Sequence, residues 1–135
     1  MEDSARARFQ AIFSRAGFDR ALVGLELLDV GDGFAKIRLP VGVEVQNMGG
    51  KLHGGAVATL VDDAGTIAIL ATDRQSRPGV STDLNVSFFA PGEGAVIAEA
   101  KVLKTGRTLA FVSVDIRREQ DGVLVAQGRM TKHLG

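Results

Sequence analysis

The sequence predicts an α+β fold in which a curved antiparallel sheet of five to six strands wraps around one long central helix. A helix-length apolar run over residues 53–71 lies in the middle of the chain, with two strand-like runs before it and four after it. Short links join the last four strands, and such links favour antiparallel neighbours. A single sheet has one face to cover, and the central helix is the only long element available to cover it.

The N-terminal part of the chain predicts a helix followed by a hairpin. Apolar side chains recur at the spacing of one helix face, at Ala5, Phe9, Ile12 and Phe13. Gly17 ends this helix. Residues 25–41 contain two strand-like runs around the turn Gly31-Asp32-Gly33, which is a hairpin signal. The segment that continues to about Lys51 is irregular and rich in glycine.

Residues 53–71 contain no proline and are too many for one strand, so we interpret them as a helix. One side of this helix is apolar and should face the sheet: Val57, Leu60, Val61, Ala64, Ile67, Ala68 and Ala71. Asp62 lies on the opposite side, among mostly small neighbours: Ala58, Gly65, Thr66 and Ile69. Small side chains let another backbone come close. We therefore expect a second copy of the helix to pack there, in a dimer or larger assembly.

Four strands are predicted after the break at Arg77-Pro78-Gly79. They cover residues 81–90, 96–104, 109–118 and 123–133. In the first of them Leu84, Val86 and Phe88 alternate with polar residues, which is the pattern of a half-buried strand. The turn Asp121-Gly122 precedes the last. This order of elements is the hotdog arrangement, and we treat residues 1–135 as one domain.

The start of the central helix offers backbone donors. The N–H groups of Gly54 and Gly55 lie at the helix N-terminus, where they lack partners within the helix and carry the positive end of the helix dipole. Such groups can stabilise an oxyanion. Asp62 lies eight residues further on, roughly 12 Å along the axis. A catalytic carboxylate must come within about 3 Å of its target, so Asp62 would serve the Gly54 site of an antiparallel neighbour.

These residues also have plainer explanations that the pattern leaves open. The sequence His53-Gly54-Gly55 would serve equally as a flexible helix entry. Asp62 would serve as a paired interfacial charge. We interpret Asp63 as a solvated charge.

Composition excludes several other classes of function. Sixteen basic residues balance sixteen acidic ones, which argues against bulk attraction to nucleic acid or to an anionic membrane. The absence of cysteine excludes disulfides and thiolate sites. No apolar run is long enough to span a bilayer, and the N-terminus lacks the apolar region of a signal peptide. We therefore expect a cytoplasmic protein. With only two histidines, far apart in the sequence, we expect no metal site.

The sequence resembles the PaaI-like hotdog thioesterases over nearly its whole length. The resemblance is carried by "LHGG", "ATLVDD", "PGVSTDLNVSF", "VLKTGRTLAF", "SVDI" and "AQGRMTKHLG", and it is closest to the branch that contains the animal enzymes. The family implies hydrolysis of acyl-CoA without a metal or other cofactor. It also implies a homotetramer built from two hotdog dimers. The bound partners would therefore be acyl-CoA and further copies of this chain.

The resemblance also implies the roles of five site residues. Asp62 matches the catalytic aspartate, which acts as general base or nucleophile. Gly54 matches the glycine whose N–H binds the thioester carbonyl, and His53 helps to shape that site. Asn47 would orient the substrate or the water. Ser81 would position the water or hold Asp62.

The phosphates of coenzyme A need local cations because the chain has no net charge. Five residues in "KTGRT" and "GRMTKH" are candidates: Lys104, Arg107, Thr108, Arg129 and Lys132. A solvated hairpin tip would explain the first three equally well. Two other functions remain open at this point, a non-catalytic acyl-CoA-binding protein and an acyl-thioester dehydratase, although dehydratases of this fold carry different motifs.

Overall fold

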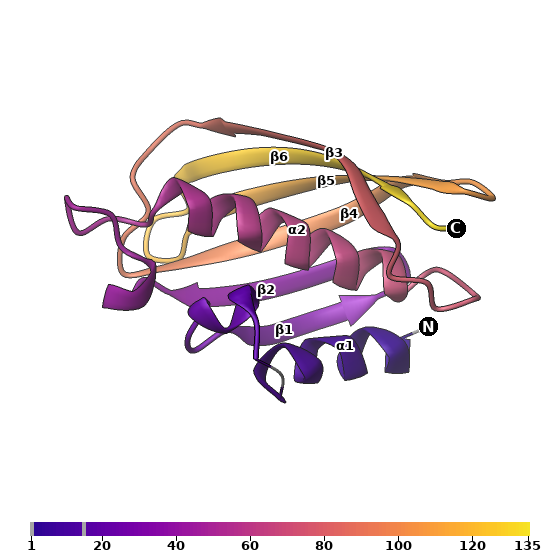
Figure 1. The fold of residues 1–135 in the computed structure, drawn as a ribbon. Helices are drawn as coiled ribbons and strands as arrows, with labels where there is room; N and C mark the ends of the chain where they lie inside the picture. The colour runs from indigo at the N-terminus through magenta and orange to yellow at the C-terminus, as the bar shows by residue number, and fades with distance from the viewer. Residues whose placement is uncertain (1, 15) are drawn as a thin grey trace.

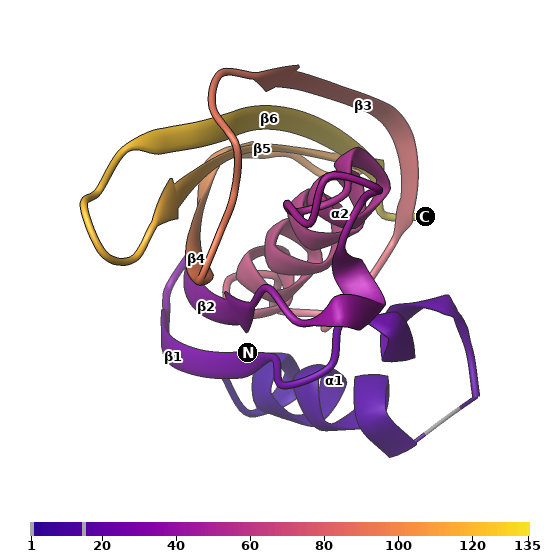
Figure 2. The same cartoon turned by 90° about the vertical axis from the view of Figure 1, so that its left-hand side faces the viewer.

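A six-stranded antiparallel sheet curls around one central helix (Figures 1 and 2). The computed structural model describes residues 2–14 and 16–135, and the side chain of Phe13 lies outside this description. The helices are α1 (Glu2–Ser14) and α2 (Gly54–Leu70), with short 3-10 turns η1 (Phe18–Ala21) and η2 (Val43–Val45). The strands are β1 (Glu26–Gly31), β2 (Phe34–Pro40), β3 (Val80–Phe88), β4 (Ala95–Thr105), β5 (Leu109–Arg118) and β6 (Leu124–His133). The predicted hotdog architecture is thus confirmed.

The order of the strands differs from the sequence-based expectation at one link. The sheet runs β1-β2-β4-β5-β6-β3, so β3 pairs with β6 rather than with β4, to which a short link joins it. The prediction that all the last four strands are successive neighbours is therefore wrong for this pair. The link over residues 89–94 can extend to about 20 Å. Three strand spacings are only about 14 Å, so the link can cross the end of the curled sheet, as Figure 2 shows.

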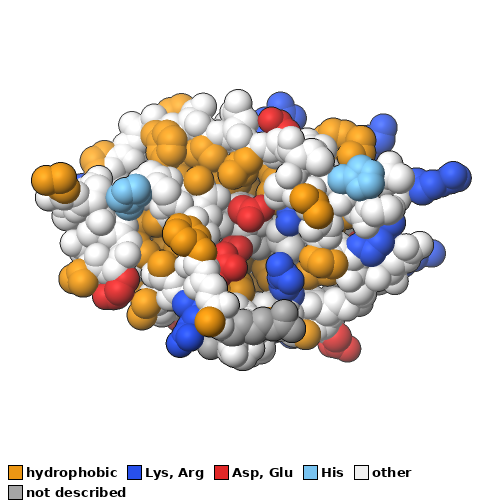
Figure 3. Space-filling model, viewed as in Figure 1, with side chains coloured by type: hydrophobic (Ala, Val, Ile, Leu, Met, Phe, Trp, Pro, Cys, Tyr) orange, Lys and Arg blue, Asp and Glu red, His pale blue; other side chains and the backbone are white. Residues whose placement is uncertain are grey.

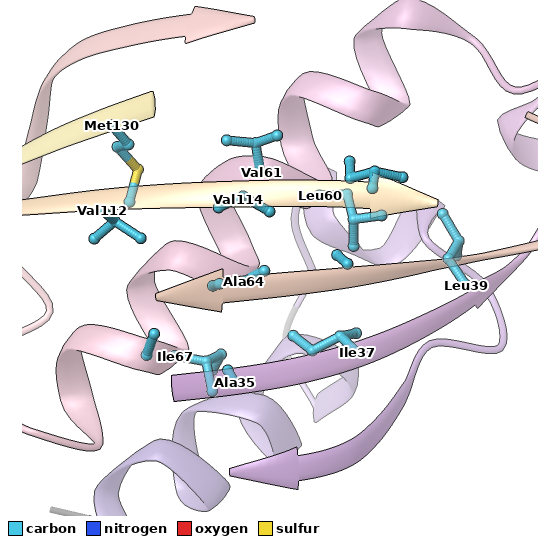
Figure 4. Close-up of a cluster of buried hydrophobic side chains, with 14 of the residues drawn as sticks. Ala35, Ile37, Leu39, Leu60, Val61, Ala64, Ile67, Val112, Val114 and Met130 are labelled. Carbon is cyan, nitrogen blue, oxygen red and sulfur yellow. The ribbon is translucent and has the colours of Figure 1, made fainter. Parts of the chain in front are cut away.

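The apolar stripe of α2 packs onto the concave face of the sheet, as predicted. Figure 4 shows Leu60, Ala64 and Ile67 of α2 in one buried cluster with residues of β2, β5 and β6. The approach is close at Gly128 of β6, where a Cβ atom would lie 2.6 Å from Val61 Cγ1. A side chain at position 128 would therefore push the helix away from the strand.

The opposite side of α2 is less open than the sequence suggested. Gly65, Thr66 and Ile69 are buried within the chain itself. A Cβ at Gly65 would lie 2.4 Å from Met130 Cε and 3.5 Å from Val112 Cγ1, because the sheet curls around this side of the helix. The expectation of an exposed small-residue face is thus wrong for the C-terminal half of α2. The partly exposed part lies around Ala58 and Asp62, in the N-terminal half.

The helix α1 packs against α2 and β1 through the predicted face, since Ala5, Phe9 and Ile12 are buried. Within the described chain, no helix combines the length and the apolar character needed to cross a bilayer.

Candidate active site

The N-terminus of α2 is capped by His53. Its backbone is extended, and its Nδ1 accepts a hydrogen bond of 2.8 Å from the Gly55 N–H. The exposed imidazole therefore has Nδ1 as an acceptor, and Nε2 is the nitrogen that carries the proton in the neutral ring. Gly54 is the first helical residue, and its N–H has no carbonyl one turn earlier within the helix. This N–H thus has no partner within the helix and can donate to a ligand at the helix start.

Gly54 lies beside the ring of Phe88 at the end of β3. A Cβ at Gly54 would be 3.6 Å from Phe88 Cε1, which is an ordinary contact. Crowding inside this chain therefore does not require glycine at position 54. Phe88 is itself 58% exposed, so this edge of the site is apolar and open. From the sequence, Phe88 is recognisable only as part of a strand pattern, and its contact with the helix start was not predicted.

An apolar hollow of about 200 Å³ lies next to the helix start. Its lining includes Phe18 of η1, Val45 of η2, and His53, Ala56 and Thr59 from the start of α2. A mostly apolar cavity with one polar edge suits a small organic group.

Asn47 lies in the exposed loop that leads into α2. Its Oδ1 accepts hydrogen bonds from the N–H groups of Gly49 (2.9 Å) and Lys51 (3.1 Å). This side chain therefore holds the turn over residues 47–51, and its amide nitrogen is the group left to act as a donor.

Asp62, Ser81 and Lys132 come together on the inner side of the curled sheet. Ser81 Oγ donates a hydrogen bond of 2.8 Å to Asp62 Oδ1. Lys132 Nζ lies 3.9 Å from the same oxygen. The Asp62 side chain is 40% exposed, whereas that of Lys132 is 7% exposed. Figure 3 shows acidic side chains open to solvent near the middle of this face, among hydrophobic ones.

Asp63 is not a solvated charge, and that interpretation is wrong. It lines a cavity of about 210 Å³ between α1, η1 and α2 with Arg8 and Asp19. Burial raises the pKa of Asp63 to about 8; the Asp19 carboxylate adds to the rise, and Arg8 opposes it. Within the described residues, the buried Asp63 Oδ2 has no hydrogen-bond partner. The fold turns this carboxyl toward the N-terminal segment because Asp62 and Asp63 are about 100° apart on the helix.

The five residues considered for the coenzyme A phosphates lie in three different places. Lys104, Arg107 and Thr108 are exposed around the β4–β5 turn, as a hairpin tip would be. Arg129 is exposed on the outer face of β6, beside a hollow of about 380 Å³ that Asp83, Asn85 and Phe111 also line. Lys132 is buried on the inner face of β6, so it is separated from the exposed cations by the sheet.

The sequence-based grouping of Lys132 with the other four candidates is therefore wrong about its surroundings. The strand pattern held the signal that would have placed it, since Gly128, Met130 and Lys132 alternate on one face of β6. Asp19 and Arg8 were missed as neighbours of Asp63 because only the fold brings α1 and η1 against α2.

No metal centre is evident in this region. Over residues 2–14 and 16–135, the structure brings together no group of three or more His, Asp and Glu side chains able to hold a metal ion.

Comparisons with known proteins agree with this architecture. A family model described as the Thioesterase superfamily matches residues 49–125. Acyl-coenzyme A thioesterase 13 of Homo sapiens is 44% identical over 138 aligned residues, which cover 100% of this chain and 97% of that protein. The Mus musculus protein of the same name is 42% identical with the same coverage.

Solved structures give the same picture. The crystal structure of zebra fish thioesterase superfamily member 2 superposes with a TM-score of 0.92 at 41% identity, covering 100% of this chain and 99% of that one. The E. coli PaaI protein superposes with a TM-score of 0.83 at 23% identity, covering 99% and 95% of the two chains, which shows a shared fold. Since the family model matches more than half of the chain and these relatives align over all of it, the chain belongs to the thioesterase superfamily, with the hotdog fold.

Proposed function

We propose that this protein is an acyl-CoA thioesterase, which hydrolyses acyl-CoA to the free acid and coenzyme A. The observation that carries the proposal is the hydrogen bond from Ser81 to Asp62. It occurs in a chain that aligns over its whole length with an acyl-coenzyme A thioesterase. A carboxylate that is oriented by a hydroxyl group in a partly open site can act as a general base or as a nucleophile.

The chemistry needs few groups because a thiolate leaves readily. Asp62 removes a proton from water as the water oxygen attacks the thioester carbonyl, or Asp62 attacks that carbonyl itself. The Gly54 N–H donates to the oxyanion that develops on the carbonyl oxygen. The carbon–sulfur bond then breaks, and the thiolate leaves with the electron pair. In the first route the thiolate takes up the proton that Asp62 removed from water. In the second route water hydrolyses the anhydride formed between the acyl group and Asp62, which releases the free acid and restores the carboxylate. His53 orders the helix start by capping Gly55, and the Asn47 amide would orient the substrate or the water.

The site is shared between two copies of the chain. Gly54 and Asp62 are roughly 12 Å apart along one helix axis, so one chain cannot bring both to the same carbonyl. The free edge of β3 supports such an assembly. This strand is paired on one side only, and it exposes Val80, Leu84 and Phe88. Unpaired edges that carry apolar side chains favour pairing with another chain. A dimer, doubled to a tetramer as the resemblance implies, is the assembly we propose.

The acyl group would lie in the apolar hollow lined by Phe18, Val45 and Ala56, next to the Gly54 donor. The phosphates of coenzyme A would lie near the exposed cations Lys104 and Arg107, with Thr108 as a further donor and Arg129 on the outer face. The cytoplasm remains our proposal for the compartment.

The proposal is tested by measuring release of free coenzyme A from short, long and aromatic acyl-CoAs with a thiol reagent. The protein contains no cysteine, so it adds no background signal. We expect wild type to hydrolyse part of the panel and Asp62→Asn to lose at least about a thousandfold in kcat, because the variant has neither base nor nucleophile. Asp3→Asn, which alters an exposed carboxyl on α1, is the control that should keep full activity.

Two results would contradict the assignment. Full activity in Asp62→Asn would remove the carboxylate from the chemistry. Binding of acyl-CoA without any release by wild type would favour the non-catalytic binding protein instead.

A further inference from the structure

Lys132 is a buried lysine that the proposed chemistry leaves without a role. Its side chain is 7% exposed, and lysine is almost never this buried unless it is paired. The strand β6 points it inward, on the same face as Met130 and Gly128, which meet α2. The ammonium group therefore lies inside the fold, where the phosphates of a ligand on the outer surface do not reach it.

The charges around Lys132 come from three elements that pack near β6. They are Asp62 and Asp63 on α2, Arg8 on α1, and Asp19 on η1. Burial lowers the pKa of Lys132, and the Asp62 carboxylate counteracts this effect more than any other group. The pKa of Asp63 is raised to about 8, so that carboxyl is mostly neutral near pH 7. Among the described residues, Asp62 has the carboxylate that lies within 4 Å of the Lys132 ammonium.

Ser81 and Lys132 approach the same oxygen of Asp62. The Ser81 hydroxyl lies 2.8 Å from Oδ1, and the Lys132 ammonium lies 3.9 Å from it. Both contacts fall on Oδ1, which leaves Oδ2 as the oxygen for the reaction. A hydrogen bond alone would orient the carboxylate, whereas a nearby cation also favours its charged form.

We infer that Lys132 is a positioning residue of the hydrolysis: its buried ammonium stabilises the negative charge of Asp62 and holds this carboxylate toward the reacting water or thioester. This inference rests on the proposed thioesterase function. It replaces the expected contact of Lys132 with coenzyme A by a contact with the carboxylate that performs the chemistry.

The inference is tested by the pH dependence of kcat/KM in Lys132→Met, which keeps most of the length of the side chain and removes its charge. Losing a cation about 4 Å away should move the acid limb of the profile upward by about one pH unit or more. Rates on the acid side should then fall about tenfold, and they should approach wild type at higher pH. Lys132→Arg keeps a cation and should keep the wild-type limb.

A matched control is available on the outer face of the sheet. Lys36 Nζ lies 3.8 Å from Glu99 Oε1, nearly the separation of the Lys132–Asp62 pair, but both side chains are exposed. Lys36→Met should leave the pH profile unchanged. A raised KM in Lys132→Met with an unmoved acid limb would overturn the inference. It would support a contact between Lys132 and the phosphates of coenzyme A instead.

A second measurement separates this inference from the proposed function. The carboxyl carbon of Asp62, assigned by comparison with Asp62→Asn, can be titrated by NMR in wild type and in Lys132→Met. Lys132→Gln replaces Lys132→Met if the latter does not fold. A titration midpoint that moves upward supports the inference even if no acyl-CoA is hydrolysed, and an unmoved midpoint overturns it even in an active enzyme.

Discussion

Asp62 and Asp63 show how adjacent residues of one type acquire different properties in a fold. Asp62 is 40% exposed, and its carboxylate is held by Ser81 and Lys132. Asp63 is turned toward Arg8 and Asp19 under the N-terminal segment, with one oxygen buried and unpaired within the described chain. One carboxylate is thus held at the surface by a hydroxyl and an ammonium group, while the other makes folding sensitive to pH.

Replacing Asp63 with asparagine should stabilise the protein at neutral pH. The folded state raises the pKa of Asp63 from its ordinary value of 3.8 to about 8. Below pH 4 the Asp63 carboxyl is protonated in both the folded and the unfolded state, so burying it costs little free energy. As the pH rises toward 8, the unfolded state loses this proton first, and stability falls. The asparagine side chain cannot ionise, and its amide can donate to Asp19. We therefore expect a gain of about 2–4 kcal/mol at pH 7.

The measurement is urea unfolding of wild type and Asp63→Asn at pH 4.5, 6 and 7.5. The difference between the two proteins should grow with pH, and Asp3→Asn should show no such trend. A constant difference, or one that shrinks as the pH rises, would contradict the account of Asp63.

The elements of the fold depend on close contact between α2 and the sheet. Gly65 of the helix faces Met130, and Gly128 of β6 faces Val61. One glycine lies in a helix and the other in a strand, but both have the same packing role. Each lets a neighbouring side chain occupy the space that its own side chain would fill. The contact fixes the position of α2, and with it the positions of Asp62 and the Gly54 N–H.

Gly128→Ala should destabilise the protein by about 1–3 kcal/mol, because the new methyl group would lie 2.6 Å from Val61 Cγ1 and valine has few alternative rotamers. Gly31→Ala is the control, since a Cβ there meets nothing within 4 Å. Urea unfolding of both variants measures the effect. Equal stability of Gly128→Ala and Gly31→Ala would show that the helix and strand are not as close as described.

The sequence predicted most of the elements because their patterns are local. Hydrophobic periodicity gave the apolar stripe from Val57 to Ala71, and the turn residues gave the β1–β2 hairpin. The pairing of β3 with β6 could not be predicted, because a six-residue link reaches either neighbour. Likewise, Lys132 was grouped with Arg129 by proximity in sequence, whereas alternation along β6 places them on opposite faces. Contacts between distant segments, such as Arg8 with Asp63, left no local signal.

At the scale of the whole molecule, the proposed site is incomplete in a single chain. The oxyanion donor at Gly54 and the carboxylate of Asp62 occupy separate turns of the same rigid helix. The N-terminal half of α2 remains partly exposed, and β3 has an unpaired edge. An antiparallel pair of copies would provide two equivalent sites, each with Gly54 from one copy and Asp62 from the other.

The most direct test of this shared site uses two inactive variants, Asp62→Ala and Gly54→Pro. Proline suits the first helical position but removes its N–H. After unfolding and refolding together in equal amounts, about half of the dimers should be mixed, each with one intact site. We expect recovery of about a quarter of wild-type activity, measured as coenzyme A release. No recovery, with mixed dimers verified by mass spectrometry, would contradict a site built from two copies of the chain.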